Sequence, residues 1–181
     1  MLKFGAVLAA MALVFCAGTA TAAQRCGATI HSRYGETRAY FHHVLAACRP
    51  DGYCSAVVAL PDSTGRTAWL QQLRVARPTP GADHQVELAA TTPFPADAGQ
   101  PMNFTFLGQS VDLTPIQTPT SPGSNEFRVS DGIATKSIVS GLRRQRVARW
   151  TYQSAAGPAE VYFSLMGMTA ALNWIDCMGA R

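Results

Sequence analysis

The sequence predicts a mainly β protein, an antiparallel β-sandwich or a partly closed barrel with two short helices, one of them C-terminal. Three observations lead to this prediction. Short runs of alternating apolar and polar residues follow one another, separated by Pro, Gly and Asp. Only two segments have helical spacing, which argues against repeated β-α-β units. Four cysteines follow residue 22, the even number expected of a disulfide-stapled domain.

Residues 1–22 have the features of a cleaved secretory signal peptide. Lys3 is followed by an uncharged apolar run over residues 4–17, and Ala20 and Ala22 supply the small residues that signal peptidase requires. Cleavage before Cys16, as in a lipoprotein, is disfavoured because Phe15 stands where a small residue is needed. We expect export to the periplasm or beyond it.

Residues 23–181 are predicted to form one domain, because no linker or repeat divides them. The composition is that of a globular protein, with 48% hydrophobic and 14% charged residues. We expect no transmembrane segment after removal of the signal, since no later apolar stretch is a better candidate. The formal charge of +4 includes Lys3 and is too small to indicate a nucleic-acid partner.

Eight to nine strands are predicted, from nine extended runs. Apolar and polar residues alternate most clearly around Leu73, Val86 and Phe104. A proline-rich loop is expected over residues 114–124. The predicted strands, in order, lie at residues 39–47, 55–60, 69–76, 85–89, 102–106, 111–113, 125–129, 147–152 and 159–165.

The first predicted helix begins at Asp131, a residue suited to the N-cap, and runs toward Arg143. We expect the buried side of this helix to carry, roughly, Ile133, Ile138 and Leu142. Gly141 should weaken the helix.

The second predicted helix covers residues 169–178. Thr169 suits its N-cap, and Leu172 and Ile175 lie on one apolar stripe. We expect this stripe to pack against the sheets.

The cysteines of the mature chain allow three pairings. Cys48 and Cys54 flank a Pro-Asp-Gly turn, which would bring them opposite each other in a hairpin. Cys26 and Cys177 then remain to join the two ends of the domain. A zinc site is the alternative, but paired C-x-x-C units are missing and an exported protein meets an oxidising compartment. We therefore predict two disulfides and no metal or other cofactor.

Three segments resemble a bacterial family. Residues 40–56 are similar to an opening "F-x-D-W-x-x-x-C … C-x-A" hairpin, residues 73–78 (LRVARP) to an "L-R-I-x-R" strand, and residues 163–172 (FSLMGMTAAL) to an "F-S-L-x-G-x-x-A-A-L" ending. These segments, in this order, resemble the proteobacterial invasion-associated locus B proteins and a related secreted family of unknown function.

The chain departs from that pattern in two places. His43 and Val44 replace the usual Asp-Trp pair, and a later "C-x-x-x-G-C" element is missing. The resemblance implies a periplasmic or secreted β-sandwich, sometimes linked to host-cell entry. It supplies no catalytic residues.

The four histidines give little indication of a metal site. His42 and His43 are adjacent, so on a strand their side chains would point to opposite faces. A site would require His31 or His84 to approach one of them, with Glu36 or Asp83 as a further ligand. Ordinary strand and loop histidines are the simpler interpretation.

No catalytic residue is assigned. Ser164 lacks the preceding glycine of a nucleophile elbow, and no glycine-rich phosphate loop is present. Paired carboxylates for glycoside hydrolysis remain open, because such pairs form only in space.

The densest charge lies at Arg143, Arg144, Arg146 and Arg149. These arginines are our candidate binding residues for an anionic envelope component, such as lipid or lipopolysaccharide phosphate, or for an acidic protein. The alternative is a helix end followed by a strand with solvated arginines.

These observations favour an exported, non-catalytic binding protein of the invasion-associated type. The alternatives are an envelope hydrolase and an exported inhibitor of a cell-wall or host hydrolase. A cleft with convergent acidic or histidine side chains would favour the enzyme, and an exposed basic or apolar face would favour binding.

Overall fold

A computed structural model describes residues 23–60, 71–94, 99–116 and 125–180. The predicted signal peptide, Trp69 and Leu70 of one predicted strand, and residues 117–124 of the predicted loop lie outside these ranges. Within them, thirteen strands and two α-helices confirm the mainly β prediction with a C-terminal helix. The sheets are antiparallel and do not close into a barrel.

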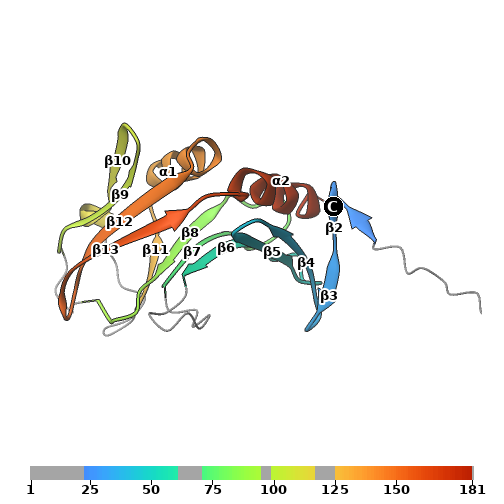
Figure 1. Cartoon of the computed structure of the whole chain (residues 1–181), viewed down its shortest axis with the longest axis horizontal. Helices are drawn as coiled ribbons and strands as arrows, with labels where there is room; N and C mark the ends of the chain where they lie inside the picture. The colour runs from blue at the N-terminus through green and yellow to red at the C-terminus, as the bar shows by residue number, and fades with distance from the viewer. Residues whose placement is uncertain (1–22, 61–70, 95–98, 117–124, 181) are drawn as a thin grey trace, which may run out of the picture.

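A strongly curved seven-stranded sheet forms the base of the molecule (Figure 1). Its spatial order is β11-β8-β7-β6-β5-β4-β3, and each neighbouring pair is antiparallel. The strands are β3 (His31–Arg33), β4 (Glu36–Phe41), β5 (Val44–Cys48), β6 (Cys54–Leu60), β7 (Gln71–Arg77), β8 (Gln85–Ala89) and β11 (Glu126–Val129).

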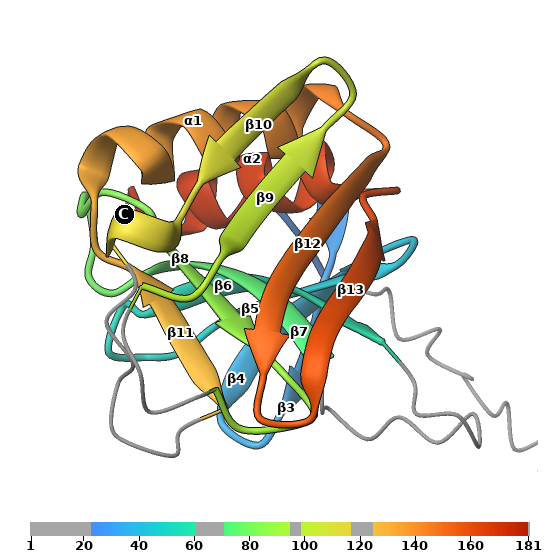
Figure 2. The same cartoon turned by 90° about the vertical axis from the view of Figure 1, so that its left-hand side faces the viewer.

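A four-stranded sheet with the order β10-β9-β12-β13 forms the second layer. Figure 2 shows it in front of the seven-stranded sheet, with the β9–β10 hairpin reaching up in front of α1. Its strands are β9 (Met102–Phe106), β10 (Gln109–Asp112), β12 (Val147–Ser154) and β13 (Gly157–Ser164). A separate hairpin of β1 (Gln24–Arg25) and β2 (Ala28–Thr29) precedes β3, and a short 3-10 helix covers Thr114–Ile116.

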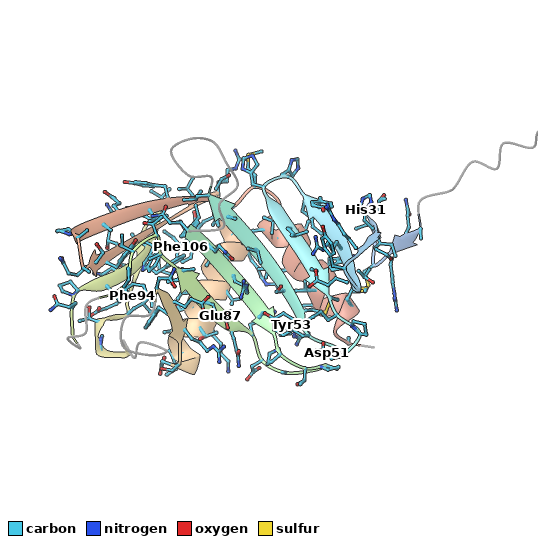
Figure 3. The ribbon with its side chains drawn as sticks, turned by 90° about the horizontal axis from the view of Figure 1, so that it is seen from below. His31, Asp51, Tyr53, Glu87, Phe94 and Phe106 are labelled. Carbon is cyan, nitrogen blue, oxygen red and sulfur yellow. A yellow bond between two sulfur atoms is a disulfide. The ribbon has the colours of Figure 1, made fainter. Side chains whose placement is uncertain are left out.

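Both α-helices lie on the upper face of the seven-stranded sheet in Figure 1. Helix α1 (Gly132–Arg144) contacts β8, β10 and β11, while α2 (Met168–Met178) contacts β4, β5 and β6. Figure 3 views the opposite face, where the strands lie in front of the helices and Glu87 and Tyr53 are labelled.

The core lies between the two sheets and under the helices. Phe94 connects the layers, with its ring centroid 6.5 Å from that of Phe127 on β11 and 5.9 Å from that of Trp150 on β12. Trp150 stacks in turn on Tyr152, with 4.1 Å between ring centroids. These residues are almost fully buried, so they join the two sheets into one hydrophobic core.

The predicted strand over residues 39–47 is wrong, because this segment is a hairpin. β4 and β5 are antiparallel with Phe41 opposite Val44, and His42 and His43 form the turn. His42 has a φ of 51°, which a turn requires and a strand does not allow. The hairpin replaces one predicted run by two strands, and the short strands β1, β2 and β3 add three more. Together they account for the difference between the nine predicted runs and the thirteen strands described.

Helix α1 begins as predicted, with the Asp131 side chain accepting a hydrogen bond from the Ala134 amide at 2.7 Å. Ile138 and Leu142 are fully buried, but Ile133 is 81% exposed, so its predicted place on the buried side is wrong. At about 100° per residue, Ile133 lies roughly 140° around the helix from Ile138.

Helix α2 begins at Met168, and the predicted Thr169 N-cap is wrong. Gly167 is the N-cap residue, with a φ of 90°, and a Cβ at this position would overlap the carbonyl oxygen of Phe41. The Thr169 hydroxyl instead donates to the Arg143 carbonyl oxygen at 2.7 Å. Leu172 and Ile175 are fully buried, as the predicted stripe requires.

Two disulfides are present, with the pairing expected from the sequence. Cys48 and Cys54 face each other across β5 and β6. Cys26 and Cys177 are 151 residues apart and join the β1–β2 hairpin to α2. The same hairpin is bound by Trp174, whose indole N–H donates to the Arg25 carbonyl oxygen at 2.9 Å.

Candidate functional site

The candidate arginines lie where α1 ends and β12 begins. Arg143 and Arg144 occupy the last turn of the helix, a favourable place for cations because carbonyl groups point out of this end. Gln145 is the C-cap residue and has an extended backbone, with φ −103° and ψ 163°. The chain therefore turns directly from the helix into β12, which separates the arginines in space.

Arg143 is bound within the fold. One of its terminal nitrogens donates to Asn173 Oδ1 at 2.5 Å and the other to Asp176 Oδ2 at 2.6 Å. Both acceptors belong to α2, so this arginine joins the two helices. It is only 28% exposed. Sequence reasoning placed Arg143 with the other arginines, but the structure directs it away from them.

Arg149 lies on the outer face of the four-stranded sheet. It forms an ion pair with Glu160 at 3.2 Å, and Glu160 also accepts a hydrogen bond from the Tyr162 hydroxyl at 2.7 Å. Arg149 and Tyr162 are directly opposite each other on β12 and β13. The charge of Arg149 is therefore partly compensated, although its side chain remains 46% exposed.

Arg144 and Arg146 are exposed, and neither has an ion-pair partner among the residues that the structure describes. They border a shallow depression of about 590 Å³ beside the β9–β10 turn. Large apolar side chains project there too, with Leu107 88% exposed, Val147 51% and Tyr162 56%. We call this set the arginine–leucine surface: Leu107, Arg144, Arg146, Val147, Arg149 and Tyr162.

The arginine–leucine surface combines two kinds of recognition. Guanidinium groups donate paired hydrogen bonds to phosphate or carboxylate oxygens. Exposed Leu, Val and Tyr side chains beside them favour contact with an apolar or amphipathic partner. Sequence analysis missed Leu107 and Tyr162. Two signals in the sequence could have identified them. Leu107 is an apolar residue directly after Phe106, where the alternation of apolar and polar residues ends. Tyr162 is an aromatic residue between Val161 and Phe163, whose side chains are buried.

Comparisons with known proteins support the fold. The chain is similar in structure to invasion associated protein B from Bartonella henselae, with a TM-score of 0.58 and 15% sequence identity. The match covers 80% of this chain and 99% of the other. No family model and no curated protein matches the sequence. At this identity the likeness establishes a shared fold, in agreement with the resemblance of the three sequence segments.

The histidines are dispersed over the molecule. His42 and His43 form the β4–β5 turn, and His31 packs edge-on against Tyr40, with 5.7 Å between ring centroids. His84 contacts α2 instead. Within the four described ranges, no group of three or more His, Cys, Asp or Glu side chains is arranged to hold a metal ion.

Among the residues that the structure describes, His43 and Ser164 form the one contact that resembles a nucleophile and its base, with His43 Nδ1 2.7 Å from Ser164 Oγ. Catalytic pairs of this kind need a third group that orients the histidine. In the described part of the chain, no carboxylate contacts His43. The pair is also exposed, which weakens electrostatic assistance. The contact joins the β4–β5 turn to the end of β13.

His84 belongs to a network centred on Asp176 of α2. His84 Nε2 lies 2.9 Å from Asp176 Oδ1, which also contacts Arg77 at 3.3 Å, while Oδ2 binds Arg143. Burial lowers the pKa of His84 below its usual value of 6.5, although Asp176 acts in the opposite direction. Near neutral pH the imidazole is therefore uncharged, and its Nε2–H donates to the carboxylate.

This pKa shift predicts a pH-dependent stability. The fold disfavours the protonated imidazole, so His84 binds a proton more readily in the unfolded chain than in the folded protein. The free energy of unfolding should therefore fall as pH drops through 6.5. His84→Gln retains a donor for Asp176 without a titratable ring. Urea denaturation should show that the free energy of unfolding falls less between about pH 7.5 and about pH 5.5 for this variant than for the native protein. An equal loss of unfolding free energy in the two proteins would contradict the role of His84 in this pH dependence.

Proposed function

We propose that this protein is an exported, non-catalytic binding protein of the invasion-associated type, and that the arginine–leucine surface contacts a phosphate-bearing anionic lipid surface. The two disulfides suit an oxidising periplasmic or extracellular compartment. Among the described residues, no helix is long and apolar enough to cross a bilayer. Invasion associated protein B, named for an association with invasion, supports a role at the cell envelope or host surface.

The observation that carries this proposal is the combination of unpaired charge and exposed apolar area. Arg144 and Arg146 present two cations whose charge no described carboxylate compensates, beside Leu107, the most exposed of the large hydrophobic residues described. A phosphate-rich lipid surface offers partners for both, since the guanidinium groups meet phosphates and the apolar side chains enter the interfacial region.

The test is binding to vesicles of phosphatidylglycerol and phosphatidylcholine. Changing Arg144 and Arg146 together to Gln should weaken binding by about 2 kcal/mol, or roughly 30-fold, because each cation near an anionic surface contributes about 1 kcal/mol. The thermal midpoint should remain nearly unchanged, since both side chains are exposed. Binding by the native protein should also weaken as salt shortens the Debye length from about 10 Å at 0.1 M to about 3 Å at 1 M.

The matched control is Arg33→Gln with Arg49→Gln, which removes the same charge from exposed arginines elsewhere. This variant should retain the native affinity. Equal binding by the native protein and the Arg144/Arg146 variant would contradict the proposed surface. Hydrolysis of an activated ester that Ser164→Ala abolishes would instead support the envelope hydrolase alternative and contradict a purely binding role.

A further inference from the structure

A second depression lies between α1 and the edge of the seven-stranded sheet. We call it the α1 groove; it is lined by the turn before β8, by the end of β11 and by one side of α1. Its volume is about 650 Å³, within the range of about 300–1,000 Å³ that small-molecule sites occupy. Arg143 faces this groove while its neighbour Arg144 borders the arginine–leucine surface, so the two sites are distinct.

The charge around the groove is positive. Lys136 lines it and has no ion-pair partner within the described ranges. Arg143 shares the single carboxylate of Asp176 with Arg77, so that cluster keeps one positive charge.

The far wall of the groove carries a further cation, Arg128. Arg128 shares Glu87 with Arg74, at 2.8 and 3.1 Å. Among the lining side chains, Arg128, Lys136 and Arg143 are cationic and Asp83 is the one carboxylate. A negatively charged ligand is therefore favoured.

Two of the lining side chains, Arg143 and His84, are already held in place. Arg143 is fixed by Asn173 and Asp176 through two of its N–H groups, and a guanidinium has five. His84 is fixed by the same carboxylate. Side chains that are ordered before binding lose little conformational entropy when the ligand arrives, which favours affinity.

The uncharged lining fits a hydroxylated carbon ring. Ser130, Ser140 and Gln85 supply groups that both donate and accept hydrogen bonds, while Pro78 and Val139 supply apolar contact. A sugar ring presents the same two features, hydroxyl groups at its edge and C–H groups on its faces.

We propose that the α1 groove binds a small sugar that carries one anionic group, with Lys136 and Arg143 contacting the anion and the serine hydroxyls contacting the ring. The anion can be a carboxylate or a phosphate, since both accept hydrogen bonds from ammonium and guanidinium groups. This site is independent of the arginine–leucine surface.

Titrations of the mature protein with glucuronate, glucose 6-phosphate and glucose, followed by amide and side-chain NMR shifts, test this proposal. The two charged sugars should shift signals of Lys136, Ser140 and His84, and glucose should bind at least about tenfold more weakly. The two charged probes distinguish a carboxylate site from a phosphate site.

Lys136→Gln should weaken binding of the charged sugars by about tenfold, and Lys136→Arg should largely retain it. Because Lys136 is exposed, neither change should lower the thermal midpoint. The Arg144/Arg146 double variant should bind the sugars as the native protein does, which separates this site from the proposed lipid surface. Equal affinity for glucose and glucuronate, or shifts that avoid the groove, would overturn the proposal.

Discussion

Removal of the Cys26–Cys177 disulfide should lower the free energy of unfolding by about 5 kcal/mol. The two cysteines are 151 residues apart, and in the chain-entropy model a cross-link restricts the unfolded chain more as the closed loop lengthens. The Cys48–Cys54 loop spans only 6 residues, and the same model gives about 2 kcal/mol. The long bridge also joins the β1–β2 hairpin to α2.

Guanidinium denaturation of two double variants checks this expectation. Cys26→Ala with Cys177→Ala should shift the midpoint much further than Cys48→Ala with Cys54→Ala. Each variant keeps the other disulfide and serves as its control. An equal loss in the two variants, or a larger loss from the short loop, would contradict the assigned role of the terminal bridge.

Leu172→Ala should destabilise the protein by about 2–5 kcal/mol, the range measured when a buried leucine is truncated and its cavity does not fully collapse. Leu172 is fully buried on α2, which packs on β4, β5 and β6. Loss of this side chain should therefore weaken the contact between the helix and the sheet.

The control is Leu107→Ala, the same truncation at a residue that is 88% exposed. It should cost less than about 0.5 kcal/mol. Thermal or urea unfolding measures both. A loss below about 0.5 kcal/mol for Leu172→Ala would contradict the docking of α2 described above.

Sequence alone was sufficient where a local pattern determines the structure. The Pro-Asp-Gly turn placed Cys48 opposite Cys54, and an even number of cysteines then left Cys26 for Cys177. Leu172 and Ile175 share a helix face because of their spacing, and both are fully buried.

Tertiary contacts decided the features that sequence reasoning missed. Thr169 has the right chemistry for an N-cap, but the N-cap residue is Gly167, two residues earlier, where the Phe41 carbonyl oxygen leaves no room for a side chain. Across the β4–β5 turn the buried positions change from odd-numbered Ala39 to even-numbered Val44 and Ala46, a change that only the folded structure reveals.

The candidate site shows the same distinction. The charge of the arginine run is evident from sequence, but the pairing of Arg143 with Asp176 depends on α1 and α2 lying side by side. Leu107 reaches the same surface from a hairpin that lies 37 residues before Arg144. Distant segments of this kind come together only in the folded chain.

Amide hydrogen exchange of residues 23–181, with and without phosphatidylglycerol vesicles, tests the arginine–leucine surface most directly. We expect slower exchange in the presence of vesicles at two segments, the β9–β10 turn around Leu107 and the α1–β12 junction around Arg146. Exchange on the opposite face of the seven-stranded sheet, around Arg74, should remain unchanged. Slower exchange confined to that opposite face, or no slowing at the two segments, would contradict the proposal that this surface binds anionic lipid.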